Sequence, residues 1–115
     1  MKLFDKKDLK KIRWYRDLYL GDSVKGSLGY YRFVINHTKR LTGLYCILPG
    51  ENDGGMLDIV RCDLVRTGIS DVKEPFIIGL AGSKREAMEL TGSIVSDVIA
   101  KTGSSDVKGF FNSVR

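Results

Sequence analysis

The chain has little of what hydrolytic enzymes and zinc proteins are built around. Its 115 residues include one histidine, His37, and two cysteines, Cys46 and Cys62. A zinc site needs several closely spaced His, Cys or carboxylate ligands, and a catalytic triad needs a carboxylate that orients the histidine. His37 lies in a basic run, His-Thr-Lys-Arg at 37–40, without a neighbouring acid. We therefore expect no catalytic residue, no metal and no cofactor.

The two cysteines do not form a recognisable motif. Cys46 and Cys62 stand in or beside apolar runs, too far apart for a zinc knuckle or a redox Cys-x-x-Cys pair. Buried free cysteines behave as small apolar residues. We expect both to be of this kind, with a disulfide between them as the alternative.

Long hydrophobic runs are absent as well. The opening residues, MKLFDKKDLKKIRW, contain no continuous apolar segment, and no stretch of the chain approaches the roughly 18 apolar residues of a membrane helix. We expect a cytoplasmic protein without a membrane span.

Glycine-rich phosphate loops are also missing. Gly79 and Gly82 precede Ser83 and Lys84, but their spacing matches neither the P-loop nor the dinucleotide fingerprint. Ser83 and Glu86 instead fit a capping box, in which Ser83 accepts from the amide of residue 86 and Glu86 reaches back to the amide of residue 83. This turn therefore predicts a strand-to-helix junction rather than a phosphate site.

Positive charge is present in excess and is unevenly spread. The net charge is +5, and residues 1–20 alone carry seven basic and three acidic side chains. Further basic residues cluster at 37–40, where the end of the expected helix favours cations, and at 84–85, in the first turn of the long helix, where the dipole disfavours them. Clusters of this kind attract polyanions. The candidate contacts are Lys6, Lys10, Lys11, Arg13, Lys39, Arg40, Lys84 and Arg85.

Hydrophobic periodicity predicts the main elements. Residues 5–20 read as a basic amphipathic helix, so that 1–21 would be a basic N-terminal helix or arm. Strands are expected at 43–49, 56–61 and 76–82, the first two forming a hairpin. A long helix is expected from Ser83 to about Thr102, with Gly103 as its terminator, and a short helix over 107–114, capped by Ser105 or Asp106. Gly92, in the middle of the long helix, predicts a close backbone approach.

Residues 22–40 can be interpreted in two ways. Val24, Leu28, Tyr31 and Ile35 share one helical face, and Asp22 or Ser23 would cap the helix. The segment YYRFVIN is also rich in strand-forming residues, with alternating aromatic and branched positions. The helix is favoured, and the strand stays open.

These elements predict one α+β domain over residues 1–115. It would have two layers, with a small, mainly antiparallel sheet of three or four strands and helices packed on one face.

Two family resemblances follow from these segments. The helix start GSKREA, after three strands, is similar to that of double-stranded-RNA-binding domains, which implies phosphate contacts by Lys84 and Arg85; Met88 and Glu89 stand where that family has a further basic position. The segments LTGLYCILP, MLDIV, FIIGLAGSKREAMELTGSIVSDVIAKTG and DVKGFF resemble a family of small proteins of Clostridia-type bacteria with no assigned function. This second resemblance implies the strand–strand–strand–helix order and a bacterial setting, and no site residue.

Charge and composition together predict a non-enzymatic binding module for nucleic acid or another polyanion, including an acidic protein surface. The alternative is a protein-interaction or assembly module, such as a homo-oligomer, because Trp14, Tyr19, Phe110 and Phe111 lie near the ends of the chain. An enzyme acting on a small anionic substrate would need a pocket lined by Lys84, Arg85 and an acid of shifted pKa.

Overall fold

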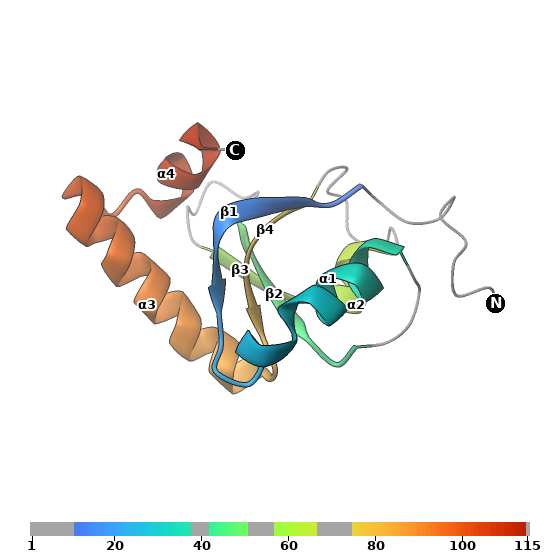
Figure 1. Ribbon diagram of the computed structural model, residues 1–115. Helices are drawn as coiled ribbons and strands as arrows, with labels where there is room; N and C mark the ends of the chain where they lie inside the picture. The colour runs from blue at the N-terminus through green and yellow to red at the C-terminus, as the bar shows by residue number, and fades with distance from the viewer. Residues whose placement is uncertain (1–10, 38–41, 51–56, 67–74, 115) are drawn as a thin grey trace.

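The computed structural model describes residues 11–37, 42–50, 57–66 and 75–114. The elements follow in chain order as β1 (Arg13–Leu20), a 3₁₀ turn η2 (Lys25–Ser27), α1 (Leu28–His37), β2 (Tyr45–Pro49), β3 (Leu57–Arg61), α2 (Cys62–Arg66), β4 (Phe76–Ala81), α3 (Lys84–Thr102) and α4 (Val107–Ser113). The fold is α+β, as predicted (Figure 1).

The four strands form one mixed sheet in the order β1-β4-β2-β3. β2 pairs antiparallel with both β3 and β4, so the predicted hairpin is confirmed. β1 pairs parallel with β4 at the other edge. The fourth strand is thus supplied by the N-terminal segment.

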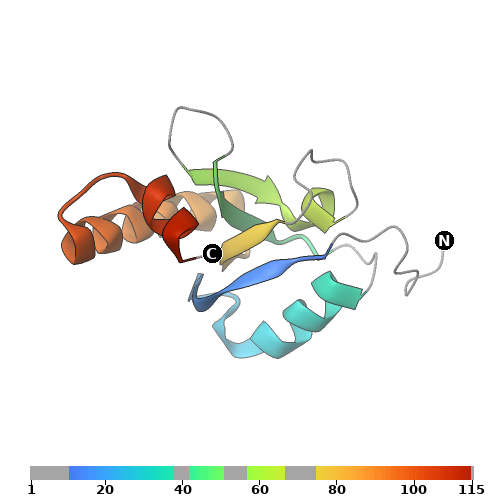
Figure 2. The same ribbon diagram turned by 90° about the horizontal axis from the view of Figure 1, so that it is seen from above.

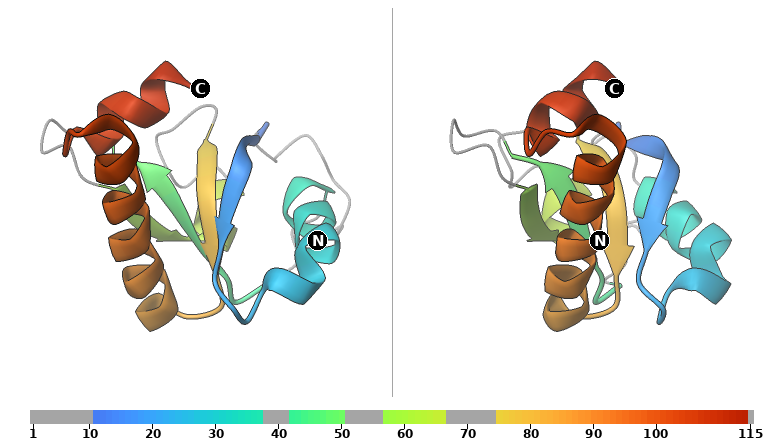
Figure 3. Two further views of the ribbon diagram at one scale, coloured as in Figure 1. Left: turned by 60° about the vertical axis from the view of Figure 1, so that its left-hand side comes forward. Right: turned by 90° about the vertical axis from the view of Figure 1, so that its left-hand side faces the viewer.

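Helices cover both faces of this sheet, which differs from the predicted two-layer arrangement with helices on one face (Figure 3). One core lies between the sheet and the α3–α4 side, with Ile78, Ile94 and Phe111 among its members. The other core joins Ile77 to Ile35 of α1 and Val65 of α2. Every residue of β4 is buried, and a strand buried on both faces requires cover on both sides.

The helix expected over residues 5–20 is wrong for residues 13–20, which form β1. Trp14 and Tyr15 face opposite cores, as successive residues of a strand do. The aromatic residues stabilise the strand by packing on both faces of the sheet. A search for helical periodicity in the sequence does not detect such packing. Residues 1–10 of the predicted arm lie outside the described residues.

Between Trp14 and Tyr19 the strand is irregular. Trp14 pairs with Ile77 and Tyr19 pairs with Gly79, so β1 advances five residues while β4 advances two. Arg16 and Asp17 in this bulge are exposed. The bulge bends β1, which lies beside β4 at the edge of the sheet (Figure 2).

The helix predictions for the remaining segments are confirmed. α1 buries Ile35, and Val24 just before it is also buried, as the predicted face requires. α3 begins after Ser83, whose Oγ accepts from the Glu86 amide, and ends at Gly103, which has a positive φ. Asp106 caps α4.

Asp22 and Ser23 do not cap the helical segment as expected. Val24 occupies that position without a side-chain hydrogen bond. Asp22 pairs with Lys25 at 2.9 Å, and the Ser23 hydroxyl donates to Glu86.

The cysteines are joined in a disulfide, so the expectation of free thiols is wrong. The β2–β3 register places Cys46 opposite Val60, and the Cys62 amide donates to the Leu44 carbonyl at 3.0 Å. The two Cα atoms are therefore only 5.3 Å apart, within disulfide range. Both cysteines lie in the core on the α1–α2 side.

Candidate functional site

The start of β1 and the last turn of α1, which belong to or adjoin two of the three predicted basic clusters, lie at one corner of the molecule. The Trp14 indole N–H donates to Asn36 Oδ1 at 2.9 Å, which holds the start of β1 against the last turn of α1. Lys11 and Arg13, both exposed, lie on either side of Ile12 at the start of β1. In sequence, Lys39 and Arg40 follow α1 directly. They lie outside the described residues, as do Lys6 and Lys10.

We use the name α1–β1 corner for Lys11, Arg13 and Trp14 of the first segment together with Tyr30, Arg32 and Phe33 of α1. The Arg32 guanidinium carbon lies 5.2 Å from the centre of the Trp14 ring, within cation–π range. Arg32 is exposed, so stacking on the indole orients it while its N–H donors remain accessible to an anion.

Exposed aromatic rings lie on another side of α1 from Arg32. Tyr30 is 48% exposed and Phe33 is 55% exposed, although large aromatic side chains are usually covered. The Phe33 and His37 ring centres are 5.0 Å apart, so Tyr30, Phe33 and His37 form a row along one side of α1. Val34 and Ile35 take up the buried side of the helix. The row therefore faces solvent in the described structure.

The corner carries positive charge that no acidic side chain among the described residues pairs with. Neither residues 11–16 nor residues 28–37 include an aspartate or glutamate. Asp17, the next acid along β1, pairs with Arg16 at 3.9 Å. Within the part of the chain that the structure describes, Lys11, Arg13 and Arg32 make no ion pair. These cations stay available to an external anion.

The third predicted cluster lies at the other end of the sheet. Lys84 and Arg85 begin α3, which follows the carboxyl end of β4, whereas Arg13 pairs beside Phe76 at the start of β4 (Figure 1). Arg85 pairs with Glu89 at 3.5 Å on the helix surface. The structure therefore does not join Lys84 and Arg85 to the α1–β1 corner.

The turn before α3 is closed by its own side chains. Ser83 Oγ accepts from the Glu86 amide at 3.1 Å, which confirms half of the predicted capping box. The other half differs, because the Glu86 carboxylate accepts from the Gly82 amide at 2.9 Å and from the Ser23 hydroxyl at 2.8 Å, rather than from the Ser83 amide. The amide of Gly82 and then the hydroxyl of Ser23 hold the pKa of Glu86 below its ordinary value.

A groove of about 300 Å³ lies beside this turn and is acidic. Asp22, Glu86 and Glu89 contribute carboxylates to its wall, and Lys25, already paired with Asp22, is the basic residue there. Neither Lys84 nor Arg85 lines it. The groove thus lacks the cationic lining that an anionic substrate would need.

A second polar group ties α3 to β1. The Tyr19 hydroxyl donates to Asp97, and Lys101 pairs with the same carboxylate at 3.1 Å. Burial and the hydrogen bond to Asp97 raise the pKa of Tyr19, whereas the hydrogen bonds from Tyr19 and Lys101 lower the pKa of Asp97. The tyrosine therefore stays protonated, and the group acts as an anchor between the strand and the helix.

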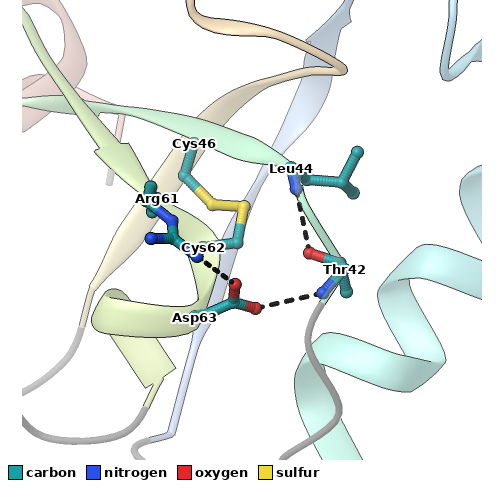
Figure 4. Close-up of polar contacts among 6 residues, drawn as sticks. All are labelled: Thr42, Leu44, Cys46, Arg61, Cys62 and Asp63. Atoms are coloured by element: carbon teal, nitrogen blue, oxygen red, sulfur yellow. Dashed lines mark hydrogen bonds and ion pairs between the residues drawn. A yellow bond between two sulfur atoms is a disulfide. The ribbon is translucent and has the colours of Figure 1, made fainter.

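Asp63 is the one charged residue that is buried in the described part of the chain. Figure 4 shows it beside the disulfide, where it accepts from the Thr42 amide at 3.2 Å and lies 3.5 Å from Arg61 Nη2. Thr42 Oγ1 in turn accepts from the Leu44 amide at 3.1 Å. The cluster fixes the chain entering β2 against the first turn of α2, which is a structural role.

Sequence reasoning missed Tyr30, Arg32 and Phe33. The signal was available, because a helical face made by Val24, Leu28, Tyr31 and Ile35 leaves Phe33 on the opposite side. The open choice between helix and strand for this segment prevented that inference. Trp14, which suggested an assembly surface, is half-buried against α1.

No group of three or more metal-ligating side chains occurs within the described ranges. None of the helices in that same part of the chain has both the length and the apolar character that a membrane crossing requires. Comparisons with protein-family models, curated proteins and solved structures gave no match to this chain. The two family resemblances therefore stay predictions.

Proposed function

We propose that the protein is a non-enzymatic module that binds single-stranded nucleic acid through the α1–β1 corner. The observation that carries this proposal is the Arg32 guanidinium stacked on Trp14, on a helix that has no acidic residue and that exposes Tyr30 and Phe33 on another side. Proteins that bind single strands combine such cations, which contact the phosphates, with aromatic faces on which bases stack.

The corner supports this function better than the α3 start does. Arg85 is paired with Glu89, and the neighbouring groove has three carboxylates, which repel phosphates. Arg32 and Phe33 are consecutive residues of α1, and their side chains point about 100° apart around the helix. A strand that crosses α1 can therefore contact Arg32 with a phosphate and Phe33 with a base. An acidic protein surface would satisfy the cations but would leave the rings without stacking partners.

A titration of the full chain with labelled single-stranded RNA and DNA tests the proposal. Trp14 is the only tryptophan, so its fluorescence reports occupancy of the corner directly. Arg32→Ala should weaken binding and lower the slope of log affinity against log salt by about 0.7, the value for one phosphate contact on a single strand. Phe33→Ala should weaken binding about tenfold through lost stacking without changing that slope.

Arg85→Ala is the matched control, because it removes one exposed arginine at the opposite end of the sheet. It should leave affinity within about twofold of wild type, as expected for a charge more than a Debye length away. Undetectable binding at low salt, or a larger loss for Arg85→Ala than for Arg32→Ala, would contradict the assignment. Far-ultraviolet circular dichroism confirms that each variant is folded.

The cytoplasmic location also stays a prediction. It was based on the absence of an apolar leader and on free cysteines, and the disulfide removes the second reason, because disulfides are uncommon in reducing compartments. Thiol labelling of the protein in freshly lysed cells measures whether Cys46 and Cys62 are oxidised where the protein resides.

A further inference from the structure

The Cys46–Cys62 disulfide lies in the same core cluster on which the α1–β1 corner rests. Both cysteines are fully buried there, together with Ile35 of α1. Trp14 packs against this cluster and carries the stacked Arg32 guanidinium. The bond and the corner are therefore parts of one packed unit, although they come from distant parts of the sequence.

The short helix α2 connects the bond to α1. It has only five residues, too few to be stable by itself. Its first residue, Cys62, is bonded to β2, and its second, Asp63, accepts from the Thr42 amide (Figure 4). Val65 of the same helix is buried in the cluster. Because α1 packs on α2, a change in the position of α2 reaches the underside of α1.

Reduction of the bond changes this unit in two ways. It removes the covalent tie between β2 and α2, and it leaves two thiols whose sulfur atoms cannot stay as close as bonded ones. Neither cysteine has exposed surface, so neighbouring groups must shift to make room. β2 is paired on both sides within the sheet, whereas α2 is a single short helix. The shift should therefore fall on α2, and with it on α1 and Arg32.

We propose that the Cys46–Cys62 bond is a redox switch for the α1–β1 corner, which is assembled in the oxidised protein and loosened in the reduced one. Its effect on nucleic-acid binding rests on the function proposed above. In the reducing step a thiolate of a dithiol attacks one of the two sulfur atoms, and the S–S bond breaks. The second thiol of the dithiol resolves the mixed disulfide. Two electrons and two protons thus pass to the protein as two thiols, and the dithiol becomes a disulfide.

The burial of the bond determines how the switch operates. A dithiol reaches the sulfur atoms only when α2 opens away from the sheet, because neither cysteine is exposed. A strand bound across α1 opposes that opening. By linkage, if the oxidised protein binds a strand more tightly than the reduced protein by some factor, the bound strand favours the oxidised form by the same factor. Affinity and redox state can therefore be checked against each other.

Binding of a labelled single-stranded oligonucleotide to the oxidised and the fully reduced full chain is the first test. Reduction should weaken binding about tenfold, a usual size for coupling between two sites. In mixtures of reduced and oxidised dithiothreitol, saturating oligonucleotide should make the midpoint potential of the bond more negative by the same factor, about 30 mV for tenfold. Equal affinities of the two forms, or a midpoint that the oligonucleotide does not move, would overturn the switch while the proposed function stands.

The Cys46→Ala/Cys62→Ala double variant is the matched control. It lacks the tie, so it should bind as weakly as the reduced wild type, and dithiothreitol should not change its affinity. A double variant that binds as tightly as the oxidised wild type would show that the tie is unnecessary and would overturn the switch. So would a reduced wild type whose far-ultraviolet circular dichroism shows loss of the whole fold, because the bond would then act globally.

Thiol reactivity tests the switch without nucleic acid and needs an exposed reference thiol. Gly92→Cys in the double-alanine background supplies one. The close backbone approach predicted at Gly92 is not found, since no atom of the described chain outside the helix's own backbone lies within 4 Å of a Cβ placed there.

If α2 loosens, iodoacetamide should alkylate Cys46 and Cys62 of the reduced native chain at a rate within about a hundredfold of that reference, as expected for a local opening. Thiols that stay unreactive until α3 also unfolds would overturn the switch. This result does not depend on whether the oxidised protein binds the oligonucleotide. Failure of the switch is thereby distinguished from failure of the proposed function.

Discussion

The two helical layers of this protein are secured in different ways. On one face, α3 and α4 are capped at their ends by Ser83, Gly103 and Asp106, α3 carries ion pairs along its surface, and Asp97 ties it to Tyr19 of β1. On the other face, α1 has no side-chain cap in the turn that leads into it. This layer is instead joined to the sheet by the Trp14–Asn36 hydrogen bond between β1 and α1 and by the Cys46–Cys62 disulfide between β2 and α2.

This difference affects which layer can offer a binding surface. Arg85 and Lys101 of α3 are paired with Glu89 and Asp97 of the same helix, which leaves little of its positive charge for an external anion. The α1 layer draws its stability from contacts below the helix, which leaves its outer surface free to hold unpaired cations and exposed rings. Three stability measurements test whether the two layers are held in these different ways.

The largest effect should come from the disulfide. Cys46 and Cys62 are 16 residues apart, and closing a loop of that length stabilises a fold by about 3 kcal/mol. Adding a reductant should lower the free energy of urea unfolding by about that amount. Hydrogen exchange should accelerate first in α1 and α2, while α3 keeps its protection.

The Cys46→Ala/Cys62→Ala double variant is the control, because its stability should not respond to reductant. An equal loss of protection in both layers would show that they are not secured separately. A wild type whose stability is unchanged after full reduction, verified by thiol alkylation, would contradict the stabilising role of the bond.

The second-largest effect should come from Glu86→Gln. This change should lower the free energy of unfolding by about 1 kcal/mol, the usual size for a capping interaction on an exposed helix end. The folded-state pKa of Glu86 is lowered by the Gly82 amide and the Ser23 hydroxyl, so its carboxylate stabilises the fold above its ordinary pKa of 4.5. This stabilisation is lost as the pH falls below that value and through the folded-state pKa.

Urea unfolding of both chains at pH 7 and at pH 3 checks this behaviour. The difference between wild type and Glu86→Gln should be present at neutral pH and should shrink in acid, with the exchange rates of α1 unaffected. If the difference in unfolding free energy between the two chains is the same at both pH values, the carboxylate charge contributes nothing to the cap.

The smallest effect should come from Arg85→Ala. Arg85 and Glu89 form an exposed pair one turn apart, and such pairs stabilise a helix by about 0.3 kcal/mol. The loss of unfolding free energy should be about that size and should vanish in high salt. A loss several times larger would indicate that surface pairs, rather than caps, secure the α3 layer.

The sequence was sufficient for the elements that local rules determine. Ser83 and Gly103 mark the ends of α3, and Asp106 marks the start of α4, because caps and helical periodicity act over a few residues. The hairpin of β2 and β3 followed from two apolar runs and a polar loop. The helix assigned to residues 13–20 failed because β1 is stabilised by pairing with β4, far along the chain, which no local pattern reports.

The candidate site was predictable only in part. Lys11 and Arg13 were named from charge, and the structure leaves both without an acidic neighbour among the described residues. Arg32 was missed because its role depends on Trp14, 18 residues earlier, and contacts between distant residues are set by the sheet. The Cys46–Cys62 bond was missed for a similar reason, since it depends on the strand register of the hairpin.

The parallel pairing of β1 with β4 also affects how the chain can reach its native state during synthesis. The hairpin of β2 and β3 is local and can form as soon as it leaves the ribosome, whereas β1, made first, must wait for Phe76–Ala81 before it has a neighbour. Until then Trp14 and Tyr15 have no sheet to cover them. A nascent chain halted before β4 should therefore bind chaperones through this first strand.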